Sequence, residues 1–279
     1  MRARPLTFVV LGGRMPGRDP VPLFADDWLV PAELHEHLGI LKTGKESEVH
    51  LVARTGGGRT VLLAEKRFKA RQFRSFKNDF LYRGEWEVGG RRENRAIAKA
   101  TRFGHEVLQS RWIGNEWENL VHLHAAGVTV PPPVELLEDG YRMAFIGDGR
   151  VAAPRLSSVA LDTPTAKRVW HELLEELAAM VAADRVHGDL SAYNVLWWRE
   201  RPVLIDFSQT VDVITHASAR ELLLRDIDAL GGYFTRRGVR YDRDWVLARV
   251  GADDHRFTAQ LLQTANRPRK RASADARLE

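Results

Sequence analysis

In this 279-residue sequence, three polar residues surround a short predicted β-hairpin and limit the folds that the chain can adopt. Asp189 and Asn194 are five positions apart, and Asp206 follows the second predicted strand, 202–205. Asp and Asn favour turns, which would explain any one of these residues alone. All three at this spacing, after a helix predicted to be buried, indicate instead that their side chains meet at one site.

These residue types suit phosphoryl transfer. In that reaction a protein mainly positions the acceptor hydroxyl and the metal-bound triphosphate. An Asp that faces the acceptor and an Asn that ligates a metal can both come from one loop, and a second Asp supplies further hard oxygen ligands. We therefore expect Asp189 to act on the acceptor, and Asn194 and Asp206 to bind Mg²⁺ or Mn²⁺. His187 is expected to be structural and to pack beneath the loop.

The run HGDLSAYN at 187–194, followed by IDFSQ at 205–209, resembles the RIO family of atypical protein kinases. Ordinary protein kinases have Arg where this chain has Gly188 and Gly where it has Ser208. Losing that Arg removes the usual partner of a phosphorylated activation loop. The resemblance implies an α+β, two-lobed protein-kinase-like fold, with a β-rich N-lobe, a helix-rich C-lobe and an ATP cleft between them.

The resemblance extends over roughly 38–239 and gives the expected domain organisation. The pattern is closer to the subgroup without an N-terminal winged helix, since the residues before 38 show no clear pattern of such a module. A basic, partly aromatic loop at about 71–104 either contacts substrate or RNA, or is a solvated surface loop. The expected divisions are an arm at 1–38, an N-lobe at 39–146, a C-lobe at 147–265 and a disordered basic tail at 266–279.

Local patterns predict the individual elements. Gly127 should end the first long helix, and Thr163 should cap the second. The expected helices are 31–37, 105–126, 164–183 and 217–236, and the expected strands are 49–52, 60–68, 134–137, 141–146, 195–198 and 202–205.

Three further segments match nucleotide-binding parts of the RIO family. Residues 43–49 match its phosphate loop, Lys66 its phosphate-binding lysine and Glu116 the helix glutamate that orients this lysine. Residues 143–147 match the segment between the lobes, whose backbone would bind adenine. Outside this context the same segments would be a β-turn, a solvated lysine and an apolar strand. The implied ATP-binding residues are Lys45, Ser47, Lys66, Glu116, Met143, Ala144, Ile146 and Ile205, and the implied catalytic residues are Lys66, Asp189 and Asp206.

The resemblance implies an enzyme that transfers the γ-phosphoryl of ATP to a Ser or Thr hydroxyl of a protein substrate or of itself. The alternative is an ATPase-type conformational switch in maturation of the small ribosomal subunit, with a transient aspartyl phosphate at Asp206. Two readings are less favoured: an inactive binding module, because the core polar residues are all present, and a small-molecule kinase of the aminoglycoside-kinase type. Residues 191–193 and 208–209 match the RIO pattern better than the latter.

The amino-acid composition limits the chemistry and the cellular location that we expect for the protein. The chain has no cysteine, which excludes disulfides, zinc ribbons and thiol catalysis and fits a reducing compartment. Its net charge of +5 suits contact with phosphate or RNA, although an arginine-rich composition alone would produce it. No stretch approaches the length of a membrane span, and the apolar run at 6–11 is broken by glycines. We expect a cytoplasmic protein without a membrane partner.

Overall fold

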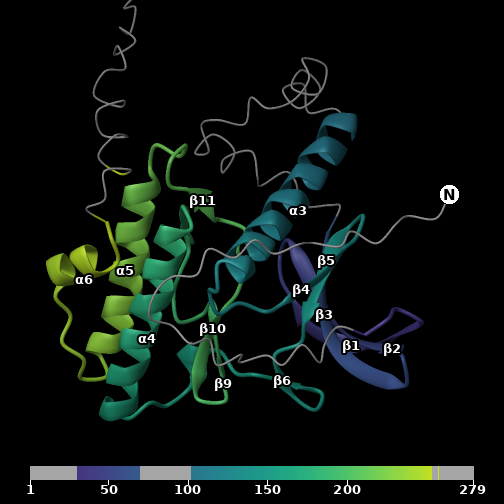
Figure 1. Ribbon diagram of the computed structural model, residues 1–279, viewed down its shortest axis with the longest axis horizontal. Helices are drawn as coiled ribbons and strands as arrows, with labels where there is room; N and C mark the ends of the chain where they lie inside the picture. Colours follow the sequence, from purple (N-terminus) through teal and green to yellow (C-terminus); the bar gives the residue numbers. More distant parts are fainter. Residues whose placement is uncertain (1–29, 70–101, 253–256, 258–279) are drawn as a thin grey trace, which may run out of the picture.

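This computed structural model describes residues 30–69, 102–252 and 257. The expected N-terminal arm, the basic loop and the basic tail lie wholly or largely outside these residues. Figure 1 shows a β-sheet on one side of the molecule and the helices α4, α5 and α6 on the other, with α3 beside the sheet. This is the expected α+β arrangement of two lobes.

A five-stranded antiparallel sheet forms the N-lobe, in the order β1-β2-β3-β5-β4. The turn between β2 and β3 uses Gly57 and Gly58, both with positive φ, which is the backbone that a tight hairpin requires. The strands are β1 (Leu34–Thr43), β2 (Ser47–Gly56), β3 (Arg59–Phe68), β4 (Pro133–Leu136) and β5 (Gly140–Ala144).

The helix predicted at 31–37 is wrong, because most of these residues belong to β1. Leu34 pairs with Thr55 and His37 with Val52, so the strand begins inside the expected N-terminal arm. Backbone pairing with β2 decides the conformation here and overrides a weak local preference for helix. The other predicted strands of this lobe are present with slightly different ends.

Helix α3 (Arg102–Ala125) lies between β3 and β4 in the chain and packs beside β4 and β5 of the sheet. Its residues Ile113, Leu120 and Leu123 are buried. The prediction that Gly127 ends this helix is confirmed: it adopts φ +80, and its N–H donates to the His124 carbonyl.

The C-lobe is built around α4, and the prediction that this helix is buried is confirmed for one stripe of apolar residues. Asp162, not Thr163, caps this helix, because its carboxylate accepts the N–H of Thr165 at 2.9 Å. Burying each large apolar side chain of the stripe stabilises the fold by about 1.5–3 kcal/mol. The stripe consists of Val169, Trp170, Leu173, Leu177, Met180 and Val181.

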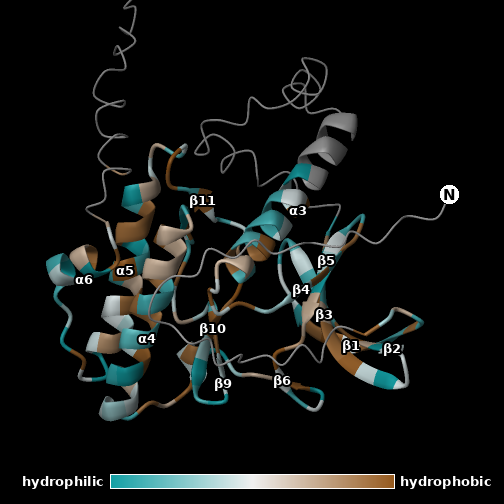
Figure 2. Ribbon diagram, in the orientation of Figure 1, coloured by the Kyte–Doolittle hydropathy of each residue, from teal (hydrophilic) through white to brown (hydrophobic). Residues whose placement is uncertain are grey.

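Other C-lobe elements surround α4. Hydrophobic and hydrophilic residues both occur along α4 and α5 (Figure 2), as in helices that bury one face and expose the other. No helix in the described ranges is long and apolar enough to cross a membrane. The elements are β6 (Gly147–Asp148), β7 (Val151–Ala152), η2 (Leu156–Ser158), α4 (Thr163–Ala182), β8 (Arg185–Val186), β9 (Val195–Trp198), β10 (Arg201–Leu204), β11 (Val211–Asp212), α5 (Ala219–Thr235) and α6 (Arg243–Arg249).

Candidate active site

A cavity of about 730 Å³ lies between the sheet and the C-lobe. Its wall comes from β1, β2, β3 and β5, from the segment after β5 and from the residues that follow β10. Most of the expected nucleotide-binding residues share this wall, although they come from distant parts of the sequence. They are Lys45, Ser47, Lys66, Met143, Ala144, Ile146, Ile205 and Asp206.

Lys66 on β3 forms an ion pair with Glu116 on α3. Its ammonium lies 2.6 Å from Glu116 Oε1, and the Tyr141 hydroxyl donates to the same oxygen at 3.1 Å. Both members of the ion pair are buried. Burial alone would lower the pKa of Lys66, but the negative charge around it, chiefly that of Glu116, holds this pKa well above its ordinary value. Lys66 is therefore a fixed positive charge in the wall of the cavity.

Asp206 follows β10 and faces Lys66 across the cavity. Its Oδ1 lies 3.1 Å from the Lys66 ammonium, and the positive charge of Lys66 lowers the pKa of Asp206. Its φ is +72, a conformation that a residue with a side chain seldom adopts. Such backbone strain is concentrated at functional sites, where the surrounding structure holds it in place.

The loop before β9 holds Asp189 and Asn194 together. The amide of Asn194 donates to the Asp189 carbonyl at 2.9 Å and to its carboxylate at 3.1 Å. The Asn194 carbonyl accepts the N–H of Ile205 at 3.0 Å, which ties this loop to the residue before Asp206. Asp189 and Asn194 are not part of the cavity wall, but they lie beside the strand end that carries Asp206.

Asp226 on α5 anchors the same loop and was not found from the sequence. Its two carboxylate oxygens accept the backbone N–H groups of Gly188 at 2.8 Å and Leu190 at 2.7 Å. Burial raises the pKa of Asp226 to about 7. The signal was present, because Asp226 is a carboxylate next to Ile227 in the apolar stripe of a predicted helix.

Gly188 has a steric reason to be glycine. Its φ is +79, and a Cβ at this position would lie 2.4 Å from the Gln209 carbonyl oxygen. The side chain that ordinary protein kinases carry at this position has no room here. His187 is fully buried, and its Nε2 lies 3.2 Å from the Ile205 carbonyl, in agreement with the structural role expected of it.

Comparison of the sequence with models of protein families shows which family the chain belongs to. The family model described as the RIO domain matches residues 65–245, which is more than half of the chain. The chain belongs to the RIO family. The matched region includes Lys66, Glu116 and the whole loop from Asp189 to Asp206, whereas the expected phosphate loop at 43–49 precedes it.

Several curated proteins are similar to this RIO-family chain over much of its length. It is 30% identical over 264 residues to serine/threonine-protein kinase RIO1 of Chaetomium thermophilum, covering 88% of this chain and 50% of that protein. It is 33% identical over 219 residues to RIO-type serine/threonine-protein kinase Rio1 of Haloferax volcanii, covering 77% and 69%. A 130-residue stretch is 35% identical to human serine/threonine-protein kinase RIO3, covering 46% and 25%.

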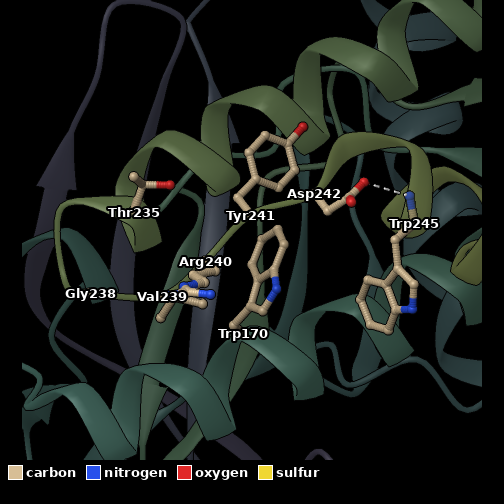
Figure 3. A pocket seen from close by; sticks show the side chains of 8 residues that line it. All are labelled: Trp170, Thr235, Gly238, Val239, Arg240, Tyr241, Asp242 and Trp245. Atoms are coloured by element: carbon tan, nitrogen blue, oxygen red, sulfur yellow. Dashed lines mark hydrogen bonds between the residues drawn. The ribbon is translucent and has the colours of Figure 1, made fainter.

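A second hollow, of about 710 Å³, lies on the C-lobe of this RIO fold (Figure 3). It is bordered by α4 and by the segment between α5 and α6, with Trp170, Tyr241 and Trp245 in its wall. Asp242, a carboxylate in this wall, accepts the N–H of Trp245 at 3.0 Å and so caps α6. The described residues that line this hollow include no counterpart of the Lys66–Asp206 pair, so the cleft between the lobes is the candidate active site.

Proposed function

We propose that this RIO-family chain transfers the γ-phosphoryl of ATP to a Ser or Thr hydroxyl of a protein, including its own. The observation that carries the proposal is the position of Lys66 in the cavity wall, where it contacts the carboxylates of both Glu116 and Asp206. A lysine fixed in this way is suited to nucleotide phosphates, because phosphoryl transfer depends on positioned charge. The relatives named above as serine/threonine-protein kinases support the same activity.

The segment after β5 suits the adenine ring. The Ala144 N–H is already bonded to the Pro132 carbonyl at 2.8 Å, and the Ile146 carbonyl accepts from Ala153 at 2.9 Å. We assign the remaining polar groups, the Ala144 carbonyl and the Ile146 N–H, to the adenine edge. Met143 and Ile205 would supply apolar contact from the wall of the cavity. Lys45 and Ser47, at the turn between β1 and β2, would contact phosphate oxygens.

The residues present fit a divalent cation such as Mg²⁺ or Mn²⁺. Asp206 offers a carboxylate with a lowered pKa, and the Asn194 amide nitrogen is already used, which leaves its oxygen as the metal-binding atom. Mg²⁺ is typically held by one or two such oxygens together with substrate phosphates. Asp206 and Asn194 would hold the ion, and the bound ion would neutralise phosphate charge.

Asp189 is assigned to the acceptor. It lies outside the wall of the nucleotide cavity, and its carboxylate is oriented by the Asn194 amide. In this position it would accept the proton of the acceptor hydroxyl as the bond to phosphorus forms. Asp226 would act through the backbone of this loop and is a positioning residue.

Single-turnover incubation with γ-labelled ATP and Mg²⁺ tests the proposal. Label that survives hydroxylamine, and that is lost in Asp189→Ala, is expected for a Ser or Thr phosphoester. Label that hydroxylamine removes, and that is absent in Asp206→Ala, would replace the kinase proposal with the ATPase-type switch through an aspartyl phosphate. A wild-type chain that takes up no label and releases no phosphate would overturn both.

A ribosomal subunit or RNA as partner and a cytoplasmic location stay predictions. They rest on basic composition and on the resemblance to proteins of ribosome maturation. Co-sedimentation of the full chain with small ribosomal subunits, with and without ATP, would test the partner. Fractionation of cells that express the tagged chain would test the location.

A further inference from the structure

Two cations that the proposed reaction does not use line the nucleotide cavity from opposite lobes. Lys42 comes from β1, and Arg155 comes from the segment between β7 and η2. Within the described part of the chain, neither side chain makes a hydrogen bond or an ion pair. Lys66, which also lines this cavity, already contacts two carboxylates.

A β-bulge turns Lys42 toward the cavity. Ile40 pairs with His50 and Lys42 with Val49, so Leu41 is an extra residue on β1. In a regular strand, neighbouring side chains point to opposite faces of the sheet. Here both Leu41 and Lys42 line the cavity. Bulges often change the direction of side chains beside functional sites. This bulge lets the Lys42 side chain line the cavity directly before the phosphate loop at 43–49.

Arg155 is held at the opposite wall by its backbone. It forms an isolated β-bridge with Leu196, which also lines the cavity two positions after Asn194. Its carbonyl accepts both the N–H of Ser158 at 2.9 Å and the hydroxyl of Ser158 at 2.8 Å. The start of the Arg155 side chain is therefore fixed, while its guanidinium has no partner among the residues described.

The charged groups around Lys42 give this part of the cavity an excess of positive charge. Removal from water and the positive charge of Arg155 lower the pKa of Lys42, while Asp206 raises it and Lys66 lowers it further. Among the described residues, the cavity wall holds four that are cationic, Lys42, Lys45, Lys66 and Arg155, against the carboxylates of Glu46 and Asp206. Two like charges that face one cavity repel each other unless an anion lies between them.

We propose that Lys42 and Arg155 form a clamp that binds the phosphate groups of the nucleotide from both lobes. The clamp rests on the proposed function, because its anion is the nucleotide of that reaction. Lys42 adjoins the phosphate loop and shares its surroundings with Asp206 and Lys66, which places the clamp at the phosphate end of the cavity. Because its two halves belong to different lobes, bound nucleotide draws the lobes together.

Binding measurements with ATP–Mg²⁺ and with adenosine test the clamp. Lys42→Gln and Arg155→Gln are each expected to weaken ATP binding about three- to tenfold and to leave adenosine binding unchanged. The double variant should lose less than the product of the single losses, because the two cations share one anion. Arg150→Gln is the matched control, since this exposed arginine lies in the nearby turn between β6 and β7 but outside the cavity wall.

A second readout separates binding from folding. Without nucleotide, each single variant should melt at the wild-type temperature or slightly above it, because one of two repelling charges has gone. Unchanged ATP affinity, or an equal loss for ATP and adenosine, would overturn the clamp. So would variants that bind ATP normally but need more protein acceptor, because the cations would then serve that acceptor. A wild-type chain that binds neither ATP nor adenosine would instead overturn the proposed function and the clamp with it.

Discussion

The ammonium of Lys66 lies 3.1 Å from the Oδ1 atom of Asp206, so one ion pair joins the two lobes across the cleft. Glu116 and Tyr141 hold the lysine side of this pair in the N-lobe. The two residues are 140 positions apart in the chain and meet only because β3 and the end of β10 face the same cavity.

Replacing Lys66 by Met should reduce phosphoryl transfer by about a hundredfold or more, because a preorganised positive charge at the phosphates is lost. It should also raise the pKa of Asp206, since the charge of Lys66 is the largest cause of the lowering. Single-turnover transfer from γ-labelled ATP measures the first effect. Lys167→Met, on the exposed face of α4, is the matched control. Transfer at the wild-type rate in Lys66→Met would remove Lys66 from its assigned role.

Glu116→Ala tests stability separately from activity. Within the described ranges it leaves Asp206 as the remaining carboxylate partner of the buried Lys66 ammonium, and breaking a buried pair typically costs about 3–5 kcal/mol. The double variant Lys66→Met, Glu116→Leu should recover most of this loss, because no unpaired charge remains, but should stay inactive. Urea unfolding measures the free energies. A double variant no more stable than Glu116→Ala would show that packing around α3, rather than the buried charge, sets the cost.

Asp189→Ala should abolish transfer and leave ATP affinity within about twofold of wild type. The reason is its position: Asp189 contacts Asn194 but is not part of the nucleotide cavity wall. Calorimetric titration with ATP–Mg²⁺, run beside the transfer assay, separates binding from chemistry. A large loss of ATP affinity would place Asp189 at the nucleotide rather than at the acceptor.

Physical reasons explain which residues of the candidate site could be expected from the sequence and which could not. Asp189, Asn194 and Asp206 were recognisable because they follow one another closely around a hairpin, so local spacing carries the signal. Lys66 and Glu116 are 50 residues apart, and their pairing could be expected only through the family resemblance. The first residues of strand β1 are predicted as helix. The prediction fails because pairing with β2, rather than the residues of β1 themselves, decides the conformation of this strand.

Other features of the site depend on tertiary contacts and could not be predicted from the sequence. The bulge at Leu41 and the bridge between Arg155 and Leu196 bring two cations to one cavity, and no spacing rule links residues so far apart. Asp226 is different, because a carboxylate inside an apolar helical stripe is visible in a sequence. Such a residue needs a buried partner. The partners proved to be backbone N–H groups of the loop at 188–190, which have no sequence signature of their own.

Asp226 gives the chain a predictable pH dependence. Its pKa is about 7 in the fold, whereas the ordinary value is 3.8. Between these two values the folded chain keeps a proton that the unfolded chain has released. Stability falls with pH wherever the folded state binds more protons, so this contribution is fully present below about pH 4 and is lost as the pH rises through 7.

Asp226→Asn removes that titration and one of the two acceptors. Its amide NH₂ would face a backbone N–H of Gly188 or Leu190, so the variant should be less stable than wild type and slower in transfer. The wild-type advantage in Tm should be at least about 2 °C larger at pH 5 than at pH 8. Melting curves across this range measure it, and Glu221→Gln on the exposed face of α5 controls for the loss of one carboxylate. An advantage that grows toward pH 8 would mean that Asp226 anchors the loop at 188–190 as a carboxylate, with its two N–H bonds outweighing burial.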